Sequence, residues 1–240
     1  MRAGLKTALA LGAAAAAVAA APAAASPGPP RIHQLVVFRD GSFKEKNTRA
    51  REVRVRVGRK SCVVGQGTAL SALVASRVAR VALHDYGSCS KRPRDASGLF
   101  VRKLGADANR GQDGWVYKVG HRTASAGAAD PSGPFGNGRL KSGTGVLWFY
   151  CHMRGSSCQR TLSFGKIDTQ QPGSVTVRVR AYNDRGKGIP AAGVTVHVGS
   201  ATATTDSGGV ARIAASAGEH TLCADGGGYV RSFKTRVDIR

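Results

Sequence analysis

Two short segments rich in aromatic residues, separated by a long loop, constrain the fold of this chain more than any other feature. Trp115 and Tyr117 occupy alternate positions in the first segment, and Trp148 and Tyr150 do so in the second. A period of two is typical of β-strands, whose side chains point alternately to opposite faces. The connecting residues, 121–139, are rich in Gly, Pro, Ser and Ala. We therefore expect two strands of one sheet, with the aromatic side of each strand against a core.

The first 25 residues have the composition of a secretory signal peptide. Positive charges at Arg2 and Lys6 precede an uncharged run rich in Ala and Leu over 7–25, which ends in small residues suited to signal peptidase. An uncleaved membrane anchor is the alternative, because this run approaches the ~20 residues that a membrane span needs. Pro22 and the weak hydrophobicity of alanine favour cleavage. We expect a secreted or cell-surface protein with no transmembrane helix in the mature chain. Residues 26–45 should form a tether, with one possible strand around 34–38.

The formal net charge of +22 is concentrated in the middle of the chain. Residues 46–165 carry 21 Lys and Arg against 6 Asp and Glu, whereas residues 173–240 carry 9 against 5. Such a polycation attracts nucleic acid, acidic lipid headgroups or anionic polysaccharide. Export makes nucleic acid the least favoured of these. The partners we expect are an anionic cell-surface polymer or another surface protein.

Five cysteines in an exported chain predict disulfides. Cys151 and Cys158 are close in sequence, and Cys62 and Cys89 flank a predicted helix. We predict these two pairs and an unpaired Cys223. The unpaired thiol is either buried as a small apolar group or available for an intermolecular disulfide.

An amphipathic strand with a charged outer face is predicted over 53–57. Val53, Val55 and Val57 alternate with Arg54 and Arg56, so the valines should face a core and the arginines should face outward. Three further basic residues lie at the ends of this strand: Arg51, Arg59 and Lys60. We interpret the five as a row that binds phosphate or carboxylate groups of a polyanion. A charged face that only keeps the protein soluble is the alternative.

A single helix is predicted over 69–78, because apolar residues recur at helical spacing and Thr68 can cap the first turn. Strands are expected over 79–83 and 99–104. One helix among several strands implies an α+β domain in which a sheet shelters the helix, and we place this domain at 46–165.

The sequence over 52–164 resembles a secreted domain family of unknown function related to the carboxy-terminal β-domain of transcobalamin and gastric intrinsic factor. The resemblance is carried by Gly-Trp-Val-Tyr-Lys-Val-Gly at 114–120, by Leu-Lys-Ser-Gly at 140–143 before the second aromatic strand, and by Gly-Thr-Ala-Leu at 67–70. It implies a β-grasp-like sheet with one helix. The chain departs from the family's usual Val-Asn-Gly at 119–121 and from its Gly-Asp at 143–144.

Short strands without a helix follow a polar linker at 166–172. Alternating valines at 175–179 and 194–198, with turn residues at 205–209, predict a β-sandwich over 173–240. The pattern is similar to carboxypeptidase-regulatory-like and other bacterial Ig-like or prealbumin-like modules, which implies a spacer or docking role.

Motifs for catalysis and cofactor binding are missing from the sequence. It contains no Gly-x-Ser-x-Gly, no His-Glu-x-x-His and no phosphate-binding P-loop. His84 and Asp85 are adjacent, and neighbours on a strand point to opposite faces. A zinc site at Cys151, His152 and Cys158 matches no common ligand spacing and lacks an evident fourth ligand. We therefore expect a protein that is not an enzyme and that uses no metal or cofactor.

Two hypotheses for function remain. In the first, the aromatic hairpin forms a small-molecule site, with contacts from Trp115, Tyr117, His121, Trp148 and Tyr150; in the alternative, the four Trp and Tyr side chains are core residues. In the second, the basic domain contacts anionic surface polymer and the sandwich holds it at a distance. We prefer the second hypothesis.

Overall fold

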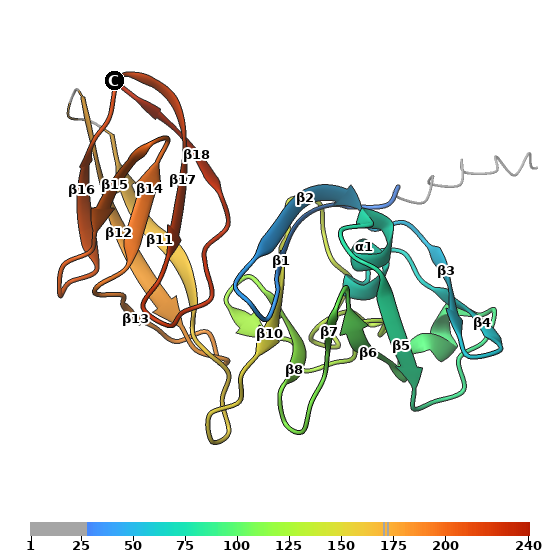
Figure 1. The fold of residues 1–240 in the computed structure, drawn as a ribbon. Helices are drawn as coiled ribbons and strands as arrows, with labels where there is room; N and C mark the ends of the chain where they lie inside the picture. Colours follow the sequence, from blue (N-terminus) through green and yellow to red (C-terminus); the bar gives the residue numbers. More distant parts are fainter. Residues whose placement is uncertain (1–27, 170, 172) are drawn as a thin grey trace, which may run out of the picture.

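The chain folds into two β-rich units that lie side by side (Figure 1). The computed structural model describes residues 28–169, 171 and 173–240. The predicted signal peptide, residues 1–25, lies outside the described residues. Within the described part of the chain, no helix is long and apolar enough to cross a membrane.

The first unit is built on a five-stranded sheet of order β2-β1-β10-β8-β9. The two predicted aromatic strands are its neighbours β8 and β10, which pair antiparallel with Tyr117 opposite Trp148 and Trp115 opposite Tyr150. Strand β1 is parallel to β10, and the other neighbours are antiparallel. The strands are β1 (Arg31–Val37), β2 (Phe43–Arg49), β8 (Gly114–Val119), β9 (Arg122–Thr123) and β10 (Gly145–Cys151).

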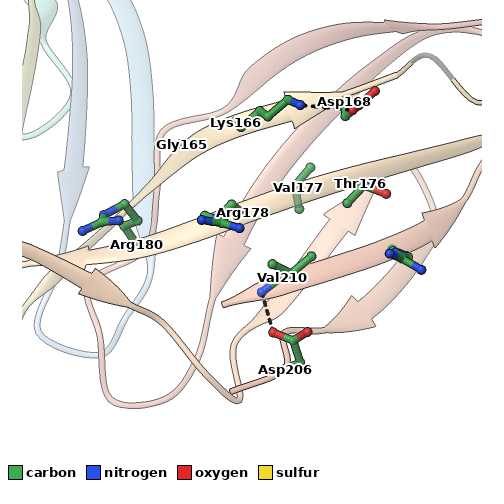
Figure 2. A pocket seen from close by; sticks show the side chains of 10 residues that line it. Gly165, Lys166, Asp168, Thr176, Val177, Arg178, Arg180, Asp206 and Val210 are labelled. Carbon is green, nitrogen blue, oxygen red and sulfur yellow. Dashed lines mark hydrogen bonds and ion pairs between the residues drawn. The ribbon is translucent and has the colours of Figure 1, made fainter. Parts of the chain in front are cut away.

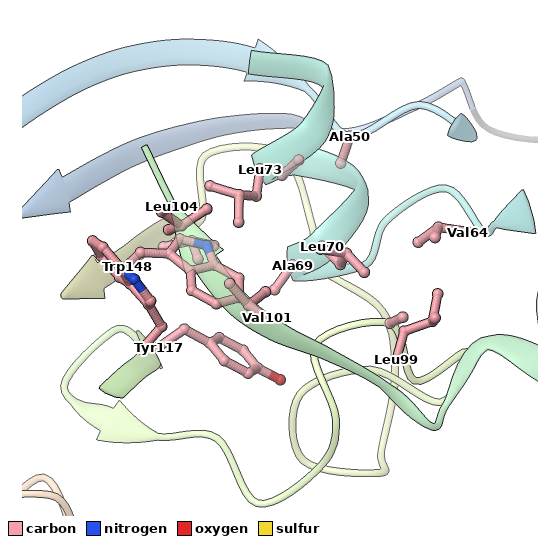
Figure 3. Packing of buried hydrophobic residues seen from close by; sticks show 14 of the residues in the cluster. Ala50, Val64, Ala69, Leu70, Leu73, Leu99, Val101, Leu104, Tyr117 and Trp148 are labelled. Carbon is pink, nitrogen blue, oxygen red and sulfur yellow. The ribbon is translucent and has the colours of Figure 1, made fainter. Parts of the chain in front are cut away.

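The predicted helix is α1 (Ala69–Ser76), the one α-helix among the described residues. Thr68 caps it as expected: its hydroxyl accepts a hydrogen bond from the Ser71 amide, and Ser71 Oγ accepts one from the Thr68 backbone amide. Leu70 and Leu73 pack onto the core of the sheet beside Trp148 (Figure 3). Smaller elements complete the unit: β3 (Val53–Val57), β4 (Lys60–Val64), β5 (Val81–Asp85), the 3₁₀ turn η1 (Pro93–Ala96), β6 (Leu99–Leu104) and β7 (Asp107–Ala108).

The tether predicted at 26–45 is wrong from residue 31 onward, because β1 is a buried strand of the sheet. Ile32 and Val36 belong to the core under α1, whereas Leu35 and Val37 belong to a cluster between the two units. A strand covered on both faces has no alternation of polar and apolar residues. The period of two that identifies half-buried strands is therefore missing from this segment.

The second unit is a sandwich of two four-stranded sheets, as predicted. Strands β11, β12, β13 and β16 form one sheet, and β15, β14, β17 and β18 form the other in that order. Buried valines at 175–179 and 194–198 fill the space between the sheets. The strands are β11 (Thr161–Asp168), β12 (Ser174–Tyr182), β13 (Gly188–Pro190), β14 (Thr195–Val198), β15 (Ala201–Thr204), β16 (Val210–Ala214), β17 (Gly218–Asp225) and β18 (Thr235–Ile239).

The linker predicted at 166–172 is also wrong in part. Strand β11 pairs with β12 in the sandwich, so the second unit begins at about Thr161 and residues 166–168 belong to a strand. The pairing shifts register between Phe164 and Ile167. This irregularity interrupts the alternation along β11, so the sequence pattern ends before the strand does.

The two units share a buried interface. Leu35, Leu147 and Phe149, on the face of the first sheet opposite α1, pack with Val230 and Phe233 of the sandwich. Lys118 points into the same interface and is completely buried. The relative placement of the units therefore depends on packed side chains and on one buried cation.

Candidate functional site

A groove lined by four arginines lies between β3, the end of α1 and β5. It encloses about 430 Å³. Apolar side chains of Val55, Val74, Val81 and Leu83 line it, and these side chains also pack against the core. In Figure 1, β3 and β5 lie on the side of the first unit away from the sandwich. We call this feature the basic groove, and its cationic residues are Arg54, Arg56, Arg77 and Arg80.

Strand β3 provides two of the arginines, as the sequence predicted. Val53, Val55 and Val57 pack on the core, so Arg54 and Arg56 are exposed. Strand β3 pairs with β4 alone in the described structure, and β5 pairs with β6. The free edges of β3 and β5 are close to each other without sharing ladder hydrogen bonds. The groove therefore runs along two open strand edges.

The helix terminus provides the other two arginines. Arg77 is the C-cap of α1, with φ of 54°, and its backbone amide donates to the Val74 carbonyl. It is the one non-glycine residue with positive φ in the described chain. This left-handed conformation, which glycine adopts at lowest cost, turns the chain into β5. Arg80 follows immediately before β5, so both exposed side chains lie at the groove.

The positive charge of the basic groove is not neutralised within the described structure. None of its four arginines has an ion pair or a side-chain hydrogen bond there. Its lining residues include no Asp or Glu. Exposed guanidinium groups in this state can donate two parallel hydrogen bonds to a carboxylate or phosphate.

The other three basic residues predicted for this surface lie outside the groove. Lys60 Nζ is 3.1 Å from Asp85 Oδ2, so its charge is paired. Arg51 and Arg59 are exposed at opposite ends of β3 and do not line the groove. The five residues therefore do not form one row: two of them contribute to the site.

Both predicted disulfides are present. Cys62–Cys89 joins β4, the hairpin partner of β3, to the segment after β5. Cys151–Cys158 closes the turn after β10, and its two sulfurs are therefore not available as zinc ligands. Cys223 is unpaired, as expected, and burial raises the pKa of its thiol.

The structure places four of the five aromatic-hairpin candidates in the core of the first unit. Trp115, Tyr117, Trp148 and Tyr150 expose between 1% and 8% of their surface. Three of them donate hydrogen bonds to backbone carbonyls, and burial raises the pKa of Tyr117. The Trp148 indole N–H has no partner in the described structure. An adjoining hollow of about 190 Å³ is smaller than the ~300 Å³ typical of small-molecule pockets.

His121 lies apart from these rings, at the interface between the units. Its ring stacks on Tyr182 of the sandwich, with 3.7 Å between ring centroids and 6° between planes. Burial and the nearby Lys118 ammonium lower its pKa below the ordinary value of 6.5. The hypothesis that all five residues form one ligand surface is therefore corrected: four are core residues and one is an interface residue.

A second basic surface lies on the outer face of the sandwich (Figure 2). It is a hollow of about 1020 Å³ whose lining includes Arg178, Arg180 and Lys166. Two of its four cations, Arg180 and Lys166, have partners within the protein, and the carboxylates of Asp168 and Asp206 also line the hollow, whereas no carboxylate lines the basic groove. Arg180 Nη2 donates to the Gly188 carbonyl at 2.7 Å, and Lys166 Nζ is 3.5 Å from Asp168 Oδ2. Because part of the positive charge of this surface is already paired within the protein, we expect it to attract an external anion less strongly than the basic groove does.

Sequence reasoning missed Arg77 and Arg80. A basic pair directly after a helix was available as a signal, but such residues usually interact with the helix's own last carbonyls. Only the placement of β3 beside α1 and β5 shows that the pair continues the surface of Arg54 and Arg56.

Comparison of the chain with family models, curated proteins and solved structures gives no match. In the described residues, no group of three or more His, Cys, Asp or Glu side chains could hold a metal ion. Function is therefore argued from the geometry of the basic groove.

Proposed function

We propose that the protein binds an anionic cell-surface polymer in the basic groove and acts as a non-enzymatic interaction protein. One observation supports this most directly: four arginines surround a single groove, and no carboxylate of the described structure is paired with them. Four neighbouring like charges repel one another, so an external anion that neutralises them is attracted strongly. A polymer with repeated phosphate or carboxylate groups can contact several of them at once.

The shape of the groove suits an extended ligand. Arg54 and Arg56 are two residues apart on one strand, so their backbone positions are separated by about 6.6 Å along the groove. Arg77 and Arg80 line the groove from the end of the helix. Apolar side chains between the cations can contact the uncharged parts of a repeating unit. A linear polyanion lying along β3 would therefore meet charge and apolar surface alternately.

We infer that this binding takes place outside the cell. Two disulfides favour an oxidising compartment, in agreement with the predicted signal peptide. The sandwich is the proposed spacer. It contacts the face of the first sheet opposite α1, so the basic groove stays free of it.

We further infer that the first unit is β-grasp-like and the second Ig-like. The order β2-β1-β10-β8-β9, with a parallel central pair and a helix packed on one face, supports the first assignment. Two facing antiparallel sheets support the second. The resemblance to the family related to transcobalamin remains the basis of the first inference.

The test is binding of the full mature chain to a purified glycerol-phosphate wall polymer at 0.1 M and 1 M salt. A variant with Arg54→Ser, Arg56→Ser, Arg77→Gly and Arg80→Ser should bind at least about tenfold more weakly at low salt. Each exposed ion pair contributes about 0.2–1 kcal/mol, and tenfold corresponds to about 1.4 kcal/mol. Wild-type binding should also weaken as the Debye length falls from about 10 Å to about 3 Å.

The matched control is Arg178→Ser with Arg212→Ser, which removes exposed arginines from the outer face of the sandwich. This variant should bind nearly as well as wild type. A loss of binding free energy in proportion to the number of arginines removed, four in one variant and two in the other, would mean that total charge, and not the basic groove, determines binding. Unchanged binding by the four-arginine variant would remove the groove from the function.

A further inference from the structure

A cluster of exposed aromatic rings lies on the first unit, away from its core. Tyr86 exposes 75% of its surface and Phe100 exposes 42%. Their ring centroids are 6.0 Å apart, and the His84 ring lies 4.3 Å from that of Tyr86. Large apolar side chains are normally buried, and an exposed group of them marks a binding surface. We call His84, Tyr86 and Phe100 the aromatic platform.

The fold holds this platform in place. His84 pairs opposite Phe100 between β5 and β6, and both point away from the core that Leu99 and Val101 enter on the other face. The Tyr86 amide donates to the Gly98 carbonyl at 3.0 Å, beside a close backbone contact: a Cβ on Gly98 would lie 2.5 Å from the Gly87 nitrogen. The rings are therefore exposed on a backbone with little freedom to move.

The turn beneath Tyr86 is fixed by one carboxylate. Asp85 accepts hydrogen bonds from the amides of Gly87 and Cys89 and from Lys60 Nζ. Burial opposes ionisation of this carboxyl, but the hydrogen bonds outweigh it and lower the pKa of Asp85. Cys89 is in turn joined to Cys62. A preorganised surface loses less conformational entropy when a ligand binds, so rigid exposed rings suit a binding role.

A hollow of about 430 Å³ adjoins the platform and contains polar groups without partners. The exposed Arg102 and Gln112 line it and make no side-chain hydrogen bond or ion pair in the described structure. Asn109, in the same lining, is satisfied internally by Trp115 and Val101. Asp113 also lines the hollow, and its carboxylate accepts a hydrogen bond from the Met153 amide and lies 3.5 Å from His152 Nδ1. The groups without partners next to the platform rings are therefore a guanidinium and an amide.

We propose that the aromatic platform binds a sugar ring of a polysaccharide. A pyranose has an apolar face of C–H groups, which stacks on an aromatic ring, and a rim of hydroxyl groups. The guanidinium of Arg102 and the amide of Gln112 can bind that rim, because each presents planar hydrogen-bonding groups. The platform rings are tilted by 57° and 62° relative to one another. Because the rings are not parallel, they form an open surface on which one face of a sugar ring can stack. They do not form a slot between two parallel rings, which would enclose a planar nucleobase.

This proposal does not depend on the basic groove, because the two sites differ in residues and chemistry. The groove lies at the edge of β5 and is cationic, whereas the platform lies on the outer face of β5 and β6. Stacking and hydrogen bonding to neutral hydroxyls are far less sensitive to salt than contacts between exposed charges. High salt therefore separates the two activities experimentally.

The test is retention of the full mature chain, at 1 M salt, on chitin, cellulose and peptidoglycan stripped of anionic polymers. We expect wild type to be retained on at least one of them. Tyr86→Ser with Phe100→Ser should reduce retention at least about tenfold, and Tyr86→Phe with Phe100→Tyr should preserve it because both rings remain. The four-arginine groove variant should be retained as wild type is.

The control Ile189→Ser removes an exposed apolar side chain on the sandwich (38% exposed) and should have no effect. Far-UV circular dichroism of each variant reports whether it is folded. The proposal is overturned if no polysaccharide retains the wild type, or if the double Ser variant is retained equally. It is also overturned if a single-stranded oligonucleotide, and no polysaccharide, binds through the two rings, because the platform would then recognise bases.

Discussion

Two cationic regions of this molecule use their charge in opposite ways. Lys118 is completely buried between the two units, and its Nζ donates to the Tyr182 and Asn183 carbonyls at 3.2 and 3.1 Å. Asp184 Oδ1 lies 3.4 Å from the same atom. The four arginines of the basic groove are exposed, and no acidic group of the described structure pairs with them. One cation is therefore satisfied by the fold, whereas four are left for a partner outside it.

The difference shows how to separate structural charge from functional charge in a strongly basic chain. A buried ammonium is tolerated only when carbonyl and carboxylate oxygens replace the water that it loses. Burial lowers the pKa of Lys118, and Asp184 opposes this shift. An exposed arginine keeps its water and needs no such partner, so the fold alone does not require it at that position.

The largest expected effect comes from the buried cation. Lys118→Met preserves the volume of the side chain but leaves the Tyr182 and Asn183 carbonyls without their donor. Leaving buried polar groups unpaired costs about 1–3 kcal/mol each, and we expect the free energy of unfolding to fall by about 3 kcal/mol. Urea denaturation measures this change. Binding to the glycerol-phosphate polymer, measured on the folded variant, should stay within about twofold.

Lys166→Met is the matched control for this substitution. Lys166 has a side chain that is 80% exposed, so the same chemical change should alter stability by less than about 0.5 kcal/mol. If Lys118→Met and Lys166→Met lower the free energy of unfolding equally, the buried ammonium of Lys118 does not stabilise the interface between the two units. If Lys118→Met instead abolishes polymer binding while it remains folded, the division between the two regions is wrong.

Sequence patterns identified the elements that have a recognisable period or cap. Strand β3 was predicted because arginines alternate with valines, the aromatic strands because Trp and Tyr recur at alternate positions, and α1 because apolar residues recur at helical spacing after a capping threonine. Strand β1 was assigned to a tether because burial on both faces removes that alternation. The burial of Lys118 was not predicted either, because the groups that surround its ammonium belong to the second unit and lie far from it in sequence.

Only two of the four arginines of the basic groove were predictable from the sequence, because the other two reach the groove through tertiary packing. Arg54 and Arg56 belong to one strand, so alternation alone places them outward. Arg77 and Arg80 join them through tertiary packing of the end of α1 beside β3, which no local pattern encodes. The platform rings were missed for the same reason: Tyr86 and Phe100 are neighbours only through the pairing of β5 with β6.

A smaller effect, in the opposite direction for stability, is expected at Arg77. A non-glycine residue in the left-handed region costs about 1–2 kcal/mol relative to glycine, part of which glycine loses through its greater freedom when unfolded. Arg77→Gly should therefore raise the free energy of unfolding by about 0.5–1 kcal/mol. It also removes one guanidinium from the basic groove, so polymer binding should weaken by about twofold to fivefold.

Arg80→Ser provides the comparison, because it removes a second groove arginine whose φ is not positive. It should weaken binding to a similar extent without raising stability. If Arg77→Gly is more stable than wild type and binds the polymer equally well, polymer binding does not explain why an arginine occupies this left-handed position. The pair of variants thus distinguishes backbone strain from charge at the groove.

The smallest effect concerns the pH dependence of the interface near Lys118. The pKa of His121 is lowered by burial and by the Lys118 ammonium, so the native state binds a proton less readily than the unfolded state. Since the unfolded state takes up more protons as pH falls through about 6.5, His121 should reduce stability between pH 7 and pH 5.

His121→Phe keeps a ring stacked on Tyr182 and abolishes this titration. The His33–Glu45 and His197–Asp225 pairs are present in both proteins, so the difference between the two pH profiles isolates His121. Because part of the ring faces solvent, the difference should be smaller than the effect of Arg77→Gly. Thermal denaturation of both proteins at pH 5, 6 and 7 measures it; parallel profiles would mean that the protonated ring is accommodated beside Lys118 without cost.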